Sequence, residues 1–200
     1  MTISWYGEAC FLLESSGTRI LIEPPSKESG IASPRLKSDI LILSRPEAKL
    51  SSNESDAFVI SSPGEYEIKN INITGVGDGD NIIYGIDMEG IKLAHLGFLK
   101  KESDNEKLEL LGNVDIILIP VGGLGNELLD SEAAMKLINK LEPSIAIPML
   151  FEVKGLKTKR APLSAFVKES EAKDPPIPKL GIKKKDINEE ETKIVILEKV

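Results

Sequence analysis

The order of apolar and polar positions divides the chain into a strand-rich first half and a second half in which helices alternate with strands. In the first half, short apolar stretches are separated by two- or three-residue turn sequences, as in β-hairpins. The pattern therefore predicts mainly antiparallel sheet in this half. The predicted strands are 3–7, 10–14, 18–22, 39–43, 58–61, 66–68, 71–73, 82–86 and 91–94.

The second half has the periodicity of helices packed on buried strands. Ser103 followed by Glu106 predicts a capping box that begins a helix ending near residue 111. Asp130 or Ser131 would cap the next helix, and Pro162 suits the first turn of a third. The continuous apolar character of the intervening strands indicates cover on both faces. These strands are 114–119, 145–148 and 194–197.

This arrangement predicts one domain, 1–200, of the α+β or mixed α/β class, with helices packed outside sheets. The apolar share of 41% and the charged share of 28% are ordinary for a globular protein. Aromatic residues make up only 4%, so the core must consist mainly of Ile, Leu and Val. Such a core favours sheet over a helical bundle.

Charge is unevenly distributed along the chain. Of 25 basic and 32 acidic residues, 12 and 9 lie in residues 152–200, which leaves 13 and 23 in residues 1–151. An acidic body argues against nucleic acid as a partner, because nucleic-acid binding needs clustered cations facing phosphates. No apolar run approaches the ~18 residues of a membrane span, and no secretory pattern follows Met1, so a cytoplasmic protein without membrane contact is expected.

Single residues and short motifs give little chemistry. Cys10, the only cysteine, reads as a buried packing residue, and His95, the only histidine, as a hydrogen-bonded structural one. One histidine cannot supply a zinc site with several imidazoles. The glycine-rich stretch 75–80 lacks the last glycine of a dinucleotide fingerprint and reads as a flexible turn, and 121–125 reads as a strand-exit loop.

Seven stretches are distinctive when they are taken in order: 5–11, 20–24, 38–43, 62–67, 94–97, 114–123 and 142–149. Together they resemble the metallo-β-lactamase-fold superfamily, in particular its small stand-alone hydrolases similar to L-ascorbate-6-phosphate lactonases. The resemblance implies a four-layer αββα sandwich of two facing mixed sheets. It also implies two clustered cations, usually zinc, that generate a hydroxide nucleophile.

The same resemblance implies that the metal-binding motif is lost. Its His-x-His-x-Asp-His ligands fall on Arg45, Glu47, Lys49 and Leu50. The other histidine and aspartate positions of the family fall on Glu8, Phe98 and Leu150. The vestigial pocket expected from this comparison consists of Glu8, Glu23, Arg45, Glu47, Lys49, Leu50, His95, Phe98 and Leu150.

Cations at ligand positions would repel a metal ion, on the order of 4 kcal/mol at ~4 Å and an effective dielectric near 20. No metal cofactor is therefore expected, although the family uses zinc. Arg45 or Lys49 would instead pair with Glu47 and Glu8 in a salt-bridged pocket.

Three functions follow from these observations. The first is a non-catalytic, metal-free homologue that keeps the fold for binding or scaffolding, its partner an unknown small molecule or protein. The second is a divergent hydrolase of a small anionic substrate, which would use Glu8, Glu23, Glu47 and His95 as acid/base groups or as ligands of a hard divalent ion. The third is an interaction subunit that binds its partner through residues 152–200.

Overall fold

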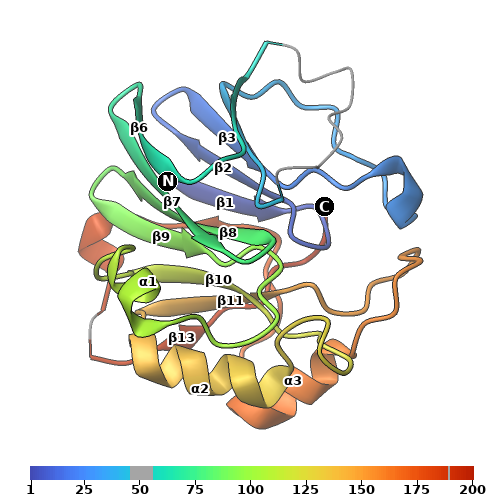
Figure 1. The fold of residues 1–200 in the computed structure, drawn as a ribbon. Coiled ribbons are helices and arrows are strands. Elements are labelled where there is room, and N and C mark those ends of the chain that lie inside the picture. Colours follow the sequence, from blue (N-terminus) through green and yellow to red (C-terminus); the bar gives the residue numbers. More distant parts are fainter. Residues whose placement is uncertain (46–55, 189) are drawn as a thin grey trace.

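Two facing β-sheets form the body of the protein in a computed structural model that describes residues 1–45, 56–188 and 190–200 (Figure 1). The first sheet has six strands in the order β12-β1-β2-β3-β4-β5, and the second has seven in the order β13-β11-β10-β9-β8-β7-β6. Both sheets are mixed. The predicted sandwich class is therefore confirmed.

The first sheet begins as an antiparallel meander and ends in parallel strands. β1 pairs with β2 and β2 with β3 in antiparallel fashion, whereas β4 and β5 run parallel to β3. The buried residues of β3 and β4 alternate between the two faces of this sheet. Its strands are β1 (Thr2–Trp5), β2 (Phe11–Ser15), β3 (Thr18–Ile22), β4 (Ile40–Ile42), β5 (Phe58–Ile60) and β12 (Leu180–Gly181).

The second sheet repeats this division. β6 to β9 form an antiparallel series, and β9, β10, β11 and β13 run parallel. β10 and β11 are buried along their whole length, as the continuous apolar pattern predicts. The strands are β6 (Gly64–Ile68), β7 (Ile71–Asp78), β8 (Asn81–Met88), β9 (Ile91–His95), β10 (Ile116–Pro120), β11 (Ile145–Met149) and β13 (Lys193–Ile194).

Two-residue turns set the register of the hairpins. Ser16-Gly17, Lys69-Asn70 and Glu89-Gly90 each have two residues with positive φ, the conformation that matches the twist of a tight hairpin. The hairpins predicted around these positions are confirmed.

The glycine-rich stretch 75–80 was wrongly predicted as a turn throughout. β7 continues to Asp78, and only Gly79 and Asp80 connect it to β8. Gly75 is needed within the strand because a Cβ there would lie 2.8 Å from the ring of Tyr84. The glycine therefore makes room for a buried aromatic side chain on the neighbouring strand.

The α-helices cover the outer face of the second sheet (Figure 1). Asp130 caps α2 and accepts a hydrogen bond from the N–H of Ala133 at 2.9 Å, as predicted. The capping box at Ser103 is wrong, because α1 begins after Asp104 and no side chain caps it. The helices are α1 (Asn105–Glu109), α2 (Ser131–Leu141) and α3 (Leu163–Ser170), with short 3₁₀ turns η1 (Lys27–Ser29) and η2 (Lys184–Asp186). Within the described ranges, none of the helices is long and apolar enough to span a membrane.

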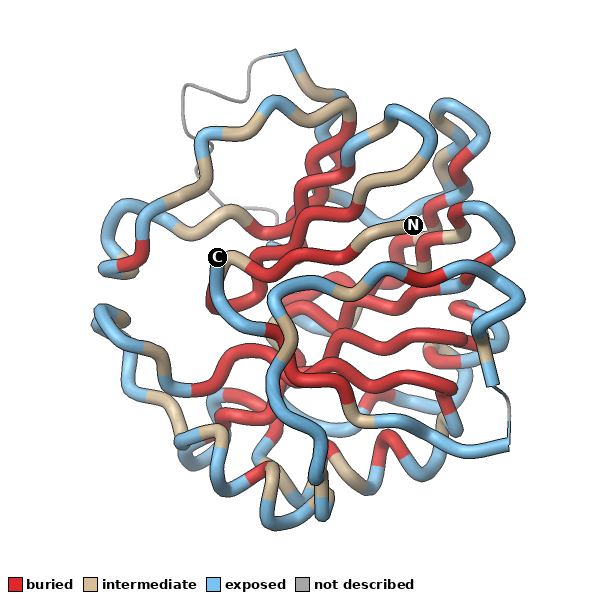
Figure 2. The backbone as a smooth tube through the Cα atoms, turned by 180° about the vertical axis from the view of Figure 1, so that it is seen from behind, coloured by how far each residue is buried: buried red, intermediate tan, exposed pale blue. Residues whose placement is uncertain are grey.

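The main core lies between the two sheets and continues under the helices, as the buried strands in Figure 2 show. It consists largely of Ile, Leu and Val, as the composition predicts. A smaller buried cluster on the opposite face of the first sheet contains Leu21, Leu41, Leu43 and Cys10. The predicted packing role of Cys10 agrees with its complete burial.

The C-terminal quarter of the chain completes both sheets. β12 pairs with β1, and β13 pairs with β11. Lys199 bridges to Trp5, so that residues near the two ends of the described chain lie side by side. Residues 152–200 are therefore an integral part of the sandwich.

A close backbone contact at Gly122 gives a first prediction. A Cβ at this position would lie 2.1 Å from the carbonyl oxygen of Leu150, where neither backbone can move easily. We expect Gly122→Ala to lower the free energy of unfolding by roughly 1–3 kcal/mol, measured by urea denaturation. Gly181→Ala is the matched control, because no atom lies within 4 Å of its added Cβ. Equal midpoints for the two variants would contradict the prediction.

Candidate functional site

Loops from both sheets surround a cavity of about 420 Å³ at one end of the sandwich. These loops follow β1, β3, β4, β9, β10 and β11, and the turn between β7 and β8 joins them. Its lining contains an unusual number of charged side chains: Glu8, Glu23, Glu28, Arg45, Asp80, Lys100, Glu127 and Arg160. The cavity has the size of a site for a small molecule.

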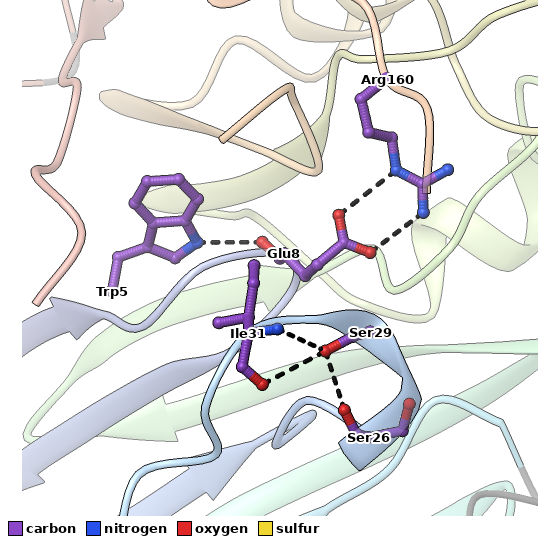
Figure 3. Close-up of polar contacts among 6 residues, drawn as sticks. All are labelled: Trp5, Glu8, Ser26, Ser29, Ile31 and Arg160. Atoms are coloured by element: carbon purple, nitrogen blue, oxygen red, sulfur yellow. Dashed lines mark hydrogen bonds and ion pairs between the residues drawn. The ribbon is translucent and has the colours of Figure 1, made fainter. Parts of the chain in front are cut away.

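Glu8 and Arg160 form a two-pronged ion pair in this cavity (Figure 3). Nε of Arg160 donates to Oε1 of Glu8 at 3.3 Å, and Nη2 donates to Oε2 at 3.1 Å. The side chain of Arg160 is only 9% exposed, and that of Glu8 only 12%. The sequence predicts that Glu8 pairs with Arg45 or Lys49. The prediction for Arg45 is wrong, because Glu8 pairs with Arg160.

The backbone of Glu8 is also fixed. Its carbonyl oxygen accepts hydrogen bonds from Nε1 of Trp5 at 2.9 Å and from the N–H of Leu150 at 3.3 Å. Leu150 is fully buried and does not line the cavity. Leu150, which the resemblance places in the pocket, therefore lies outside the lining and supports the loop that carries Glu8.

The guanidinium of Arg45 lies over the ring of Phe98 on another wall of the cavity. The guanidinium carbon is 3.6 Å from the centroid of the ring, the geometry of a cation–π contact. The side chain of Asn81 holds the backbone of Phe98, because Oδ1 of Asn81 accepts a hydrogen bond from the N–H of Phe98 at 2.8 Å. Two side chains from family ligand positions therefore contact each other.

Glu23 is buried and holds the backbone of the next strand. Its carboxylate accepts the N–H of Ser44, while the carbonyl oxygen of Ser44 accepts the N–H of Ile82 from the second sheet at 2.7 Å. Burial raises the pKa of Glu23, against the opposing effects of the Ser44 hydrogen bond and the charge of Arg45. This carboxyl is thus easier to protonate than an exposed glutamate.

His95 lies beneath the cavity and does not line it. Its Nδ1 accepts the N–H of Gly97 at 3.1 Å, so the proton belongs on Nε2, which donates to the carbonyl oxygen of Ala9 at 3.1 Å. Burial lowers the pKa of His95 to about 4. These contacts fit the hydrogen-bonded structural role predicted from the sequence, and the bond to Ala9 also connects the two sheets.

Three residues in loops at this end of the sandwich have left-handed backbone conformations. Glu8, Glu23 and Leu150 all have positive φ values, of 50°, 46° and 59°. Such conformations cost about 1–3 kcal/mol each and persist where the surroundings enforce them. The other predicted site residues Glu47, Lys49 and Leu50 lie outside the described residues.

The described residues do not fit a zinc site. They contain no group of three or more His, Cys, Asp or Glu side chains that could hold a metal ion. Both oxygens of Glu8 are bound by Arg160, and Glu23 is engaged with Ser44. Arg45 and Phe98, at ligand positions of the family, offer no lone pair suited to zinc.

Sequence reasoning missed Arg160, Lys100 and Asp80. The ion pair between Lys100 and Asp80 has an N–O distance of 2.7 Å and joins two loops of the cavity. The signal for Arg160 was present in the basic run Lys157-Thr158-Lys159-Arg160, but its partner Glu8 lies 152 residues away. Spacing along the chain does not reveal such a pair.

The ion pair at Glu8 gives a second prediction. Arg160→Ala leaves a buried carboxylate without its cation, so we expect a loss of about 3 kcal/mol in the free energy of unfolding. In a double-mutant cycle, adding Glu8→Gln should recover part of this loss. Lys136→Ala, which removes the exposed pair with Glu132, is the control and should change the midpoint little. Additive effects of Arg160→Ala and Glu8→Gln would show that the pair is not coupled.

His95 gives a third prediction, on pH. Its pKa is about 6.5 in the unfolded chain and about 4 in the folded one, so the unfolded chain binds the proton more readily. The stability contributed by neutral His95 is complete above pH 6.5 and is lost as the pH falls towards 4, by about 3 kcal/mol in total. Urea denaturation between pH 7 and 4 should show this loss, and His95→Gln should show a smaller slope. An equal slope in the variant would assign the pH dependence to other groups.

Comparisons with known proteins agree with this fold. The family described as Beta-lactamase superfamily domain matches residues 2–150. A UPF0173 protein of Pyrococcus furiosus is 29% identical over 180 residues, covering 74% of this chain and 82% of that protein. A UPF0173 metal-dependent hydrolase of Thermoplasma acidophilum is 27% identical over 188 residues, with the same coverage of 74% and 82%.

A crystal structure of a similar protein extends this comparison to nearly the full length of both chains. It is of a candidate Zn-dependent hydrolase of the metallo-β-lactamase superfamily from Thermotoga maritima. The TM-score is 0.83 at 30% sequence identity, and the alignment covers 98% of each chain. With its sandwich fold and a family match over residues 2–150, this chain belongs to the metallo-β-lactamase superfamily of metal-dependent hydrolases.

Proposed function

We propose that this chain is a metal-free, non-catalytic member of its superfamily that uses the cavity to bind a ligand. The observation that carries the proposal is the pairing of Arg160 with Glu8 inside the cavity. A protein cation thereby neutralises a carboxylate at the place where relatives are expected to use metal ions. The Arg45–Phe98 contact supports the same conclusion at two further family ligand positions.

A guanidinium group replaces the charge of a metal ion but not its chemistry. A divalent ion lowers the pKa of its bound water and so produces hydroxide near neutral pH. Arginine has no open coordination position and stays protonated, so it can bind and orient an anion but cannot generate this nucleophile. The cavity is therefore suited to recognition.

The carboxylate-based hydrolase has less support. His95 has both ring nitrogens engaged with the backbone and no exposed surface. Both oxygens of Glu8 are bound by Arg160. Burial raises the pKa of Glu23, but one of its oxygens holds Ser44.

An interaction subunit based on residues 152–200 is also less favoured. This segment supplies β12 and β13, each of which pairs with a strand of the body. Deletion of residues 173–200 would therefore remove an edge strand from each sheet. Loss of a partner after such a deletion would report damage to the fold rather than loss of a binding surface.

The proposal predicts substoichiometric zinc, iron and manganese after purification without chelator, measured by elemental analysis. The same protein should show no metal-dependent hydrolysis of phosphodiester, lactone or thioester substrates when each ion is added. The Thermotoga maritima relative, purified in parallel, is the control for metal lost in handling. One metal ion per chain, or turnover that an added ion stimulates and a chelator abolishes, would overturn the proposal.

A further inference from the structure

Arg45 presents an unused set of hydrogen-bond donors to the cavity. One face of its guanidinium is covered by Phe98, but its nitrogen atoms form no hydrogen bond or ion pair with a residue of the described ranges. An aromatic ring on one face leaves the edge of the guanidinium available. That edge matches the planar oxygens of a carboxylate or phosphate.

Arg160 offers one further donor. Nε and Nη2 are used by Glu8, whereas Nη1 has no partner among the described residues and is directed away from Glu8 in Figure 3. The side chain is only 9% exposed and lines the cavity. A charged donor in such a place requires either water or a ligand oxygen.

Two of the five acidic side chains that line the cavity are paired with cations. Glu8 is paired with Arg160 and Asp80 with Lys100. Glu23 is buried and has a raised pKa, while Glu28 and Glu127 are exposed at the rim.

Residues 152–161, here called the strap, add further positive charge next to this rim. They carry Lys154, Lys157 and Lys159 besides Arg160. With Glu152 of the strap included, six basic and six acidic side chains balance in the cavity and strap, although the chain as a whole has a net charge of −7.

The strap also limits the size of the ligand. The backbone N–H of Lys157 donates to the carbonyl oxygen of Ser29 at 2.8 Å. The backbone N–H of Ala161 donates to the carbonyl oxygen of Gly122 at 3.0 Å. The strap therefore connects loops that follow β3 and β10 beside the cavity. Thr158 adds a hydroxyl to the lining. An enclosure of about 420 Å³ suits a small molecule rather than a polymer.

The geometry points to this cavity as a binding site for a small carboxylate or phosphate anion, with the guanidinium of Arg45 and the free Nη1 of Arg160 as its donors. This assignment rests on the proposed metal-free function and names the ligand class for the same cavity. Glu8 positions Arg160, and Phe98 positions Arg45. The two arginines then supply the recognition.

Isothermal titration calorimetry with inorganic phosphate, acetate and malonate, at constant ionic strength set with chloride, tests the site on the full chain. We expect saturable binding of phosphate or of a carboxylate, and the tighter of the two identifies the ligand chemistry. Arg45→Gln should weaken this binding about tenfold or more, since a hydrogen-bonded charge is lost. Arg160→Lys keeps a cation beside Glu8 but removes the planar fork, and it should also weaken binding.

Arg19→Gln is the matched control, because Arg19 pairs with Glu14 and lies outside this cavity. It removes the same charge and should leave anion binding unchanged. No binding of any of the three anions to metal-free wild-type protein would overturn the inference, as would equal weakening by Arg45→Gln and Arg19→Gln. Elemental analysis of the same sample separates the two proposals: anion binding that depends on a resident metal contradicts the metal-free function, whereas metal-free protein that binds no anion contradicts only the ligand assignment.

Discussion

The backbone of Ser44 is the point at which the two sheets and the cavity are held together. Its N–H is bound by the carboxylate of Glu23 at the end of β3, and its carbonyl oxygen accepts the N–H of Ile82 from β8. Two further hydrogen bonds join the sheets: the hydroxyl of Tyr84 donates to the carbonyl oxygen of Leu43 at 2.9 Å, and His95 donates to that of Ala9. Because these partners are buried, their hydrogen bonds are costly to break. The loops that surround the cavity therefore start from fixed positions.

The strained residues of the site follow from this arrangement. Glu8 and Glu23 can keep left-handed backbone conformations because the contacts of Trp5, Leu150 and Ser44 determine their positions. These loops carry carboxylates that are bound by other groups of the protein. The negative charges are balanced by cations from other loops: Arg160 forms an ion pair with Glu8, and Lys100 forms one with Asp80.

Local patterns predicted much of the fold, and long-range contacts account for most of the errors. The hairpins at Ser16-Gly17 and Glu89-Gly90 follow from turn chemistry that involves neighbouring residues only. The stretch 75–80 was misread because the need for Gly75 arises from the ring of Tyr84 on another strand. At the site, the resemblance named Glu8, Arg45 and Phe98 as cavity residues, and the structure places all three in its lining. It could not name Arg160, whose role depends on a contact across most of the chain.

The separation of Glu8 and Arg160 also bears on how the protein is made. The ribosome releases Glu8 long before Arg160, and β12 and Lys199, which flank β1, emerge later still. During synthesis, the first hairpin can therefore form while one edge of β1 lacks its neighbours and Glu8 is solvated rather than paired. Contacts of such high sequence separation form slowly because a long loop must close first. The cavity is thus among the last parts of the nascent protein to assemble, because it is complete only when nearly the whole chain has folded.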